Sequence, residues 1–323
     1  MRDAQGRDIE YLRLAITDVC NLRCLYCMPE GGVKPLRHEE LLRFEELLRV
    51  VRIMAGLGVH TVRLTGGEPM ARRGCLTLAR MLKDEAGIER LAMTTNGLLL
   101  KGRMAEARAA GLDALNISID TLDPAAYARI TRGGDVATAL AAIREAVEVG
   151  FSVKLNAVPV RGLNEAGLCD LAALARELPL DVRFIELMPV GCGTELEPVP
   201  MDAVRAMLEK RFGPLQSDDA VHGAGPAIYM KPQGFTGSVG FIAAVSHAFC
   251  DRCNRVRLTP EGRLKLCLNH SAGTDLRALL RQGISDDGLR DVIRSAMLRK
   301  PTRHGFSEPI PDRELRRMNQ IGG

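Results

Sequence analysis

Short apolar runs alternate with amphipathic stretches along the first 190 residues of the chain. The runs have the length and alternation of strands, and the stretch at 38–57 has apolar residues at helical spacing until Gly56 and Gly58 end it. Six strand–helix units in series predict a parallel sheet with right-handed crossovers. The expected strands are 10–17, 59–65, 90–94, 113–119, 152–158 and 181–188.

Such a series favours an α/β fold, an incomplete (βα)6 TIM-like barrel, and leaves a flat doubly wound sheet as the alternative. The pattern changes after Pro198, where we expect a helix, two strand-like runs, a cysteine-bearing segment and two more helices. We therefore expect a barrel domain over 1–220 and a smaller C-terminal domain over 221–323. The later elements are expected at 201–211, 227–231, 239–246, 250–267, 273–282 and 286–299.

Several of the expected strands carry polar residues on one face. Because side chains alternate between the two faces of a strand, the basic residues of four strands would share one side of the sheet. If the apolar faces meet the helices, these basic residues converge on one cavity, where they suit phosphate or carboxylate oxygens. A local network of ion pairs with Asp or Glu is the alternative. The four residues are Arg13, Arg63, Lys154 and Arg183.

Composition narrows the class of protein. Of 323 residues, 46% are apolar and 26% charged, which predicts a packed core. A net charge of +4 is too small to indicate a nucleic-acid binder. No run approaches the roughly 18–20 apolar residues that span a bilayer, and no secretory signal opens the chain, so we expect a soluble, cytoplasmic protein without a membrane partner. The chain has nine cysteines, an odd number, and the reducing cytoplasm disfavours a framework of disulfides.

The first cysteine cluster, Cys20, Cys24 and Cys27, has the spacing Cys-x3-Cys-x2-Cys and follows the first expected strand. Loops at that end of βα barrels hold active sites. A zinc ion would need a fourth ligand, for which Cys75 and His38 are the nearest candidates. A cubane iron–sulfur cluster accepts three cysteines and leaves one iron open.

The second cluster, Cys250, Cys253 and Cys267, has the spacing Cys-x2-Cys-x13-Cys, with His270 two residues beyond. Taken alone, this spacing favours a zinc site with the histidine as fourth ligand. A second cubane with three thiolates is the other interpretation, and the residues alone leave both open. Of the three remaining cysteines, we expect Cys75 and Cys169 to be small buried residues and Cys192 to be exposed without a role.

The first cluster, with Tyr26 before its last cysteine, resembles the radical S-adenosylmethionine superfamily. The segment Thr65-Gly66-Gly67-Glu68-Pro69, at the end of the second expected strand, resembles that family's glycine-rich motif. The resemblance implies an N-terminal 4Fe–4S cluster whose open iron binds S-adenosylmethionine. Electron transfer to this group then yields a 5′-deoxyadenosyl radical.

A closer resemblance covers nearly the whole chain. The segments Phe-Cys-Asp-Arg-Cys-Asn-Arg-Val-Arg-Leu at 249–258 and Arg-Phe-Ile-Glu-Leu-Met-Pro-Val-Gly at 183–191, with the terminal Gly-Gly, are similar to the GTP 3′,8-cyclase family of molybdenum cofactor biosynthesis. The resemblance implies a lyase with a second 4Fe–4S cluster that receives the guanine of GTP. The adenosyl radical would abstract the ribose 3′ hydrogen, and the carbon radical would attack guanine C8. The product would be (8S)-3′,8-cyclo-7,8-dihydroguanosine 5′-triphosphate.

The same resemblance assigns individual residues, each by its match to the family's motifs. It implies a downstream cyclic pyranopterin monophosphate synthase and an electron donor such as flavodoxin or ferredoxin. The sequence leaves the oligomeric state open, with a homodimer as one alternative. Thr61 departs from relatives that have a basic residue there. The resemblance places cluster ligands at Cys20, Cys24, Cys27, Cys250, Cys253 and Cys267, and S-adenosylmethionine contacts at Tyr26, Gly67, Ser118 and Met188. It places GTP contacts at Arg13, Arg63, Thr94, Lys154, Arg183, Arg255, Val256 and Arg257. It implies catalytic roles for Arg255, Arg257, Gly322 and Gly323.

Two rival hypotheses remain. Another radical S-adenosylmethionine enzyme with an auxiliary cluster, such as one that modifies peptides or a haem precursor, has less use for converging strand arginines or a terminal Gly-Gly. A zinc-bearing binding protein without catalysis leaves the Gly-Gly-Glu-Pro motif unexplained.

Overall fold

In the computed structural model, which describes residues 1–306 and 312–322, the first six strands lie side by side in chain order and run parallel. A doubly wound sheet reverses its strand order and carries helices on both faces, so this sequential order excludes that alternative. All six expected strands are present. They are β1 (Tyr11–Ala15), β2 (Thr61–Thr65), β3 (Arg90–Thr95), β4 (Ala114–Ser118), β5 (Ser152–Ala157) and β6 (Leu180–Ile185).

The sheet continues beyond these six strands into the C-terminal part of the chain. β10 (Arg255–Leu258) pairs parallel with β1, and β9 (Val239–Ile242) pairs parallel with β6, so the parallel run is two strands longer than expected. Antiparallel strands follow on both sides, and in the described part of the chain β12 and β7 form the edges of one open, twelve-stranded sheet. These outer strands are β7 (Leu215–Ser217), β8 (Ile228–Pro232), β11 (Arg263–Lys265) and β12 (Thr274–Asp275).

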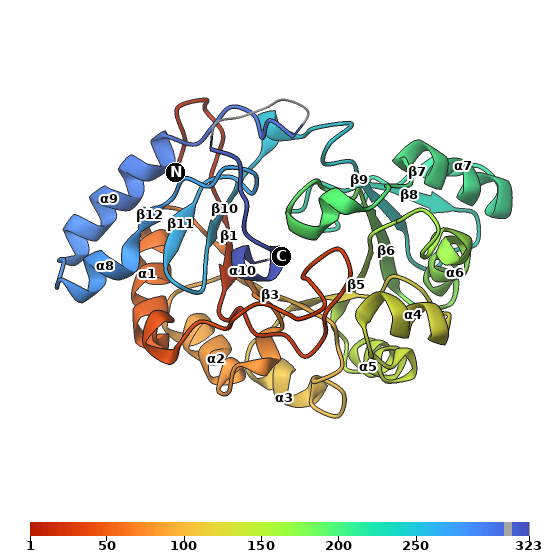
Figure 1. The fold of residues 1–323 in the computed structure, drawn as a ribbon, viewed down its shortest axis with the longest axis horizontal. Coiled ribbons are helices and arrows are strands. Elements are labelled where there is room, and N and C mark those ends of the chain that lie inside the picture. Colours follow the sequence, from red (N-terminus) through yellow and green to blue (C-terminus); the bar gives the residue numbers. More distant parts are fainter. Residues whose placement is uncertain (307–311, 323) are drawn as a thin grey trace.

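Helices cover the outside of this open arc, as Figure 1 shows. None of the described helices is long and apolar enough to cross a membrane. The helices are α1 (Phe44–Gly56), α2 (Cys75–Glu85), α3 (Met104–Ala109), α4 (Pro124–Thr131), α5 (Val136–Glu148), α6 (Leu168–Glu177), α7 (Met201–Phe212), α8 (Leu276–Arg281), α9 (Asp286–Leu298) and α10 (Met318–Ile321).

The helix expected at 38–57 is divided in the structure. His38–Glu40 forms a separate 3-10 turn, and α1 begins only at Phe44. Arg43 caps α1, because its backbone N–H donates to the Glu46 carboxylate at 2.7 Å. The end of the helix at Gly56 is as expected.

The apolar faces of the strands pack against the helices and form the core. Leu12, Leu64, Ile117 and Leu155, from β1, β2, β4 and β5, have no exposed surface. Their strand neighbours in sequence point to the opposite, concave face. The polar residues of the strands are therefore gathered inside the arc, and α10 at the end of the chain also lies there, near the centre of Figure 1.

Two predictions about the remaining cysteines were wrong. Cys192 is 6% exposed, because the C-terminal segment crosses the turn that carries it and brings Arg317 against Gly191. Cys169 is only partly buried on α6, although it packs against the core. Cys75 is 2% exposed, as expected.

Candidate active site

A cavity on the concave face of the sheet is strongly cationic. It brings together Arg13, Arg63 and Arg183 of the four basic strand residues and leaves Lys154 outside its lining. The Glu186 carboxylate, also in the lining, already accepts the backbone N–H of Val245 at 2.7 Å. The arginine and lysine side chains of the lining are Arg13, Arg63, Arg183, Arg255, Arg257 and Lys300.

The arginines are adjacent because of strand register. Arg13 on β1 is the register partner of both Arg257 on β10 and Arg63 on β2, so three guanidinium groups form one row across the sheet. Burial, and then repulsion from Arg257, lowers the pKa of Arg13 well below its ordinary value. Burial, with repulsion from Arg255, lowers the pKa of Arg257 to about 10. Like charges at this proximity are stabilised by a bound anion.

Three residues of the cavity lining have buried polar atoms without a hydrogen-bond partner in the described part of the chain. Among the described residues, no hydrogen-bond partner reaches Nη1 of Arg63, Oγ1 of Thr94 or Oδ1 of Asn116, although all three atoms are buried. All three residues line the cavity. Buried polar groups are normally paired, so these atoms indicate binding positions for a polar molecule.

Arg183 and Lys154 both contact polar side chains of the protein itself. The Arg183 guanidinium donates to Oδ1 of Asn156 from Nε at 3.0 Å. Lys154 forms an ion pair of 3.2 Å with Asp181, and its ammonium also donates to the Tyr229 hydroxyl at 3.0 Å. At Lys154 the structure therefore has the local ion pair that was the alternative to a ligand contact.

Cys20, Cys24 and Cys27 lie in the loop after β1 and affect one another electrostatically. Burial, and then the charge of Cys27, raises the pKa of Cys24 well above its ordinary value. Burial, and then the charge of Cys20, raises the pKa of Cys27 to about 12. Three neighbouring thiols that resist ionisation need a cationic partner to become thiolates, and iron supplies that charge in a cluster.

The glycines of the Gly-Gly-Glu-Pro motif pack against this cysteine loop. A Cβ atom on Gly66 would lie 2.2 Å from the carbonyl oxygen of Thr17, and one on Gly67 would lie 2.4 Å from that of Val19. The backbone N–H of Gly67 donates to Thr17 at 2.8 Å. These contacts give both glycines a packing role, and Gly67 lies beside the loop that carries Cys20.

The other residues assigned by resemblance divide into two groups. Tyr26, Ser118, Met188 and Thr94 line the cavity, and the Tyr26 hydroxyl donates to Asp120 at 2.8 Å. Val256 does not share that side, because it is the register partner of Leu12 and packs into the core. A contact between Val256 and GTP would therefore involve its backbone, and the assignment stays a prediction.

The second cysteine cluster opens into the cavity, since Cys250, Cys253 and Cys267 all line it. Burial raises the pKa of Cys253, but the positive charges of Lys300 and Arg255 outweigh this effect and lower it to about 7. His270 is directed elsewhere: Nδ1 lies 3.0 Å from an Asp312 oxygen, and Nε2 lies 3.2 Å from the carbonyl oxygen of Arg303. Both ring nitrogens are thus engaged, which argues against His270 as a fourth zinc ligand.

The C-terminal segment reaches the row of arginines. Nη1 of Arg257 donates to the carbonyl oxygen of Gly322 at 2.7 Å. Gly322 has a φ of +79°, and a Cβ atom there would lie 2.8 Å from that of Ala15. Only glycine suits this position. Gly323 lies outside the described residues.

Sequence reasoning missed several residues that line the cavity. Tyr11 shares a strand face with Arg13, and that alternation could have indicated it. Asn116 and Asn156 were recognised as polar strand residues but given no role. Lys300 had no signal, because its place beneath the second cysteine cluster depends on hydrogen bonds to the carbonyl oxygens of Arg255 and Leu266.

Known protein families match both parts of the chain. Models of the Radical SAM superfamily and of Molybdenum Cofactor Synthesis C match residues 14–175 and 180–306. The chain is 45% identical over 327 residues to GTP 3′,8-cyclase of Pelotomaculum thermopropionicum and 43% identical to that of Heliobacterium modesticaldum, with 100% of each chain covered. It also resembles Streptococcus suis SuiB bound to S-adenosylmethionine, with a TM-score of 0.65 and 16% identity over 90% of this chain and 68% of that chain. This last likeness shows the fold alone.

Proposed function

The chain belongs to the GTP 3′,8-cyclase family of the radical S-adenosylmethionine superfamily, and on that premise we propose that its cationic cavity is the site where GTP is cyclised. The reaction joins C3′ of the ribose to C8 of guanine and gives (8S)-3′,8-cyclo-7,8-dihydroguanosine 5′-triphosphate, the first step of molybdenum cofactor biosynthesis. The observation that carries the proposal is the row of Arg257, Arg13 and Arg63 in a cavity that the second cysteine cluster also lines.

The enzyme uses S-adenosylmethionine and two 4Fe–4S clusters. Reduced through the N-terminal cluster, S-adenosylmethionine supplies the organic radical that removes the hydrogen from C3′. We assign that cluster to Cys20, Cys24 and Cys27, whose buried thiols need a cation to ionise. We assign the other to Cys250, Cys253 and Cys267. Tyr26, Ser118 and Met188 line the same cavity as Cys250, Cys253 and Cys267, and we assign the S-adenosylmethionine site to these three residues.

The chain's own residues then bind and orient the nucleotide. The arginine row fits the triphosphate, since planar guanidinium groups donate in pairs to phosphate oxygens. Thr94 and Asn116 have buried oxygen atoms that no described residue engages, and these suit the hydroxyl and amino groups of a nucleoside. Lys300 and Arg255 stabilise Cys253 as a thiolate, which favours cluster binding at the guanine end.

The proposal extends to partners and compartment. Its product is a substrate for a cyclic pyranopterin monophosphate synthase. Its two reducing electrons, one that cleaves S-adenosylmethionine and one that, with a proton, quenches the radical left on guanine, come from a donor of the flavodoxin or ferredoxin type. We also propose a homodimer. None of the nine cysteines, all of them among the described residues, forms a disulfide, which fits a reducing cytoplasm.

One experiment tests the function. The chain is reconstituted anaerobically with iron and sulfide, then incubated with S-adenosylmethionine, dithionite and GTP deuterated at C3′. We expect 5′-deoxyadenosine that carries deuterium, and a cyclised nucleotide of the mass of GTP. Omission of GTP, or its replacement by ATP, is the control and should suppress both products. Deoxyadenosine formed equally without GTP, or free of deuterium, would overturn the proposal.

A further inference from the structure

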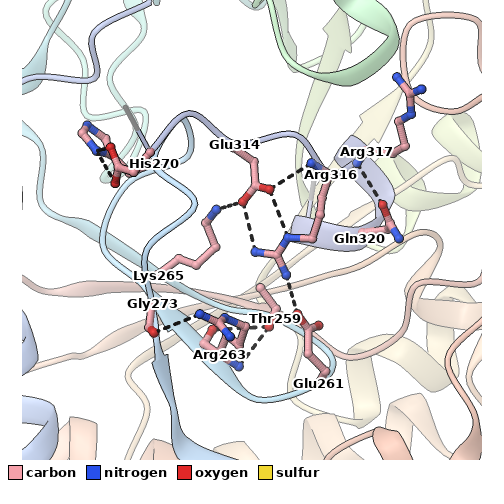
Figure 2. A network of polar contacts seen from close by, with 11 residues as sticks. Thr259, Glu261, Arg263, Lys265, His270, Gly273, Glu314, Arg316, Arg317 and Gln320 are labelled. Atoms are coloured by element: carbon pink, nitrogen blue, oxygen red, sulfur yellow. Dashed lines mark hydrogen bonds and ion pairs between the residues drawn. The ribbon is translucent and has the colours of Figure 1, made fainter. Parts of the chain in front are cut away.

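A buried ion pair holds the C-terminal segment that delivers Gly322 to the cavity. Lys265 on β11 and Glu314 contact each other with side chains that are only 0% and 1% exposed. Figure 2 shows the two charged groups facing each other between the sheet and the returning segment. The pair joins residues 49 positions apart in sequence, so it fixes the segment to the sheet rather than to itself.

Glu314 is also fixed by its own neighbours. Arg316 donates to its two carboxylate oxygens from Nε and Nη2, each at 3.0 Å, and donates to Glu261 from Nη1. The backbone N–H of Glu314 donates to the carbonyl oxygen of Asn269 at 2.6 Å. One carboxylate therefore accepts from two cations while its backbone is bound to the loop beyond β11.

The path from Glu314 to Gly322 is short and held at further points. The backbone N–H of Arg317 donates to Gln320 at 2.9 Å and starts α10. Nδ2 of the Asn319 side chain donates to the backbone carbonyl oxygen of Asp18 at 2.9 Å. The Gly322 carbonyl oxygen accepts a hydrogen bond of 2.7 Å from Nη1 of Arg257. A shift of the segment by one residue at Glu314 would move that oxygen away from Nη1.

We propose that the Lys265–Glu314 pair is a positioning device for the cyclisation: it sets the register of the C-terminal segment so that Gly322 meets Arg257. This role rests on the proposed function, because the cyclisation is the reaction that the segment would serve. Buried ion pairs add little to stability compared with apolar contacts, but they accept only one arrangement of partners. Neither Lys265 nor Glu314 lines the cavity, and the pair acts on the substrate only through Arg257, the register partner of Lys265, and through Gly322.

The test uses Glu314→Gln in the full chain. This change keeps the shape of the side chain but leaves the Lys265 ammonium buried without its counter-charge. When the C-terminal segment leaves the sheet, water reaches that ammonium while the sheet itself stays intact, so the substitution favours release. Trypsin cleaves after Arg313, Arg316 and Arg317, which all lie on the segment. We expect release of the C-terminal peptide, followed by mass spectrometry, to become at least tenfold faster.

Turnover should follow the release. We expect kcat to fall at least tenfold while the KM for GTP changes less than threefold, because the cavity arginines stay on the sheet. Glu106→Gln is the matched control: it removes an exposed ion pair with Arg103 on α3 and should change neither quantity. Lys265→Met added to Glu314→Gln removes the unpaired ammonium and should recover at least threefold of both losses.

The outcomes are separable. If trypsin released the peptide from the Glu314→Gln variant at the wild-type rate, the tethering role would be overturned. If the variant released the peptide rapidly but kept its kcat, the role in catalysis would be overturned. A double variant no better than Glu314→Gln would show that the two charges do not act as a pair. Proteolysis does not depend on the reaction. If the wild-type chain protects its segment but does not cyclise GTP, the proposed function fails and the tether stands.

Discussion

The ammonium nitrogen of Lys154 lies 3.2 Å from a carboxylate oxygen of Asp181, its register partner on the neighbouring strand. Burial lowers the pKa of this lysine to about 8, although attraction to Asp181 opposes the shift. The ammonium also donates to the backbone carbonyl oxygen of His222. The loop that carries His222 thus occupies the position beside Lys154, and a phosphate that reached this lysine would replace the His222 carbonyl.

This pKa predicts how GTP binding depends on pH. Because the value is lowered, Lys154 loses its proton as pH rises through about 8, and only its protonated form attracts phosphate. We expect kcat/KM for GTP to be constant below about pH 7, to reach half of that value near pH 8, and to fall above that, approaching ~10-fold per pH unit. Lys154→Arg keeps its charge and should remove the fall up to pH 9. An unchanged profile in this variant would show that another group causes the dependence.

Lys154 also marks how far sequence reasoning could go. Strand alternation was sufficient to place Arg13, Arg63 and Arg183 on one face, because it depends only on local geometry. It could not show that Asp181 lies beside Lys154, which depends on the register between strands. The same limit applies to Lys265 and Glu314, whose pairing depends on where the last residues of the chain return to the sheet.

The helices and strands divide in the same way. Periodicity predicted the six strands and the helices at 201–211, 273–282 and 286–299, and it differed at 38–57, where α1 begins only at Phe44. It missed β10 and β11, because the cysteine-bearing segment has few apolar residues. β10 is stabilised by pairing with β1, and β11 by pairing with β10. Pairing between distant segments leaves no periodic pattern within either segment.

Gly322→Ala should abolish most turnover by moving the C-terminal segment. A Cβ atom there would lie 2.8 Å from Cβ of Ala15 and 3.0 Å from Oγ1 of Thr65. We expect kcat to fall at least ~30-fold, as a misplacement of about 1 Å costs on the order of 100-fold in rate. Gly283→Ala is the matched control, because Gly283 has a similar φ of +81° but nothing within 4 Å of the added carbon. It should cost roughly 1 kcal/mol of stability and no activity. Equal kinetics for the two variants would contradict the steric argument.

Gly67→Ala should impair the N-terminal cluster selectively. The added carbon would lie 2.4 Å from the carbonyl oxygen of Val19, so the loop that carries Cys20 must shift. We expect the reconstituted variant to hold about half the iron of the wild type, by iron and sulfide analysis, since one of two four-iron clusters is lost. Gly31→Ala, in the same loop region but with nothing within 4 Å, should hold full iron. A full iron content in Gly67→Ala would mean that the loop tolerates the displacement.

His270→Ala distinguishes the two interpretations of the second cysteine cluster. If His270 were a metal ligand, its loss would empty the C-terminal site. In the structure its ring is engaged by Asp312 and by the carbonyl oxygen of Arg303, so we expect the iron content and the visible absorption of the cluster to remain at the wild-type level. Cys267→Ala is the positive control and should lower the iron content to about half. Because Asp312 begins the segment that leads to Gly322, His270→Ala should still lower kcat by a few-fold. Iron loss as large as that of Cys267→Ala would restore His270 as a ligand.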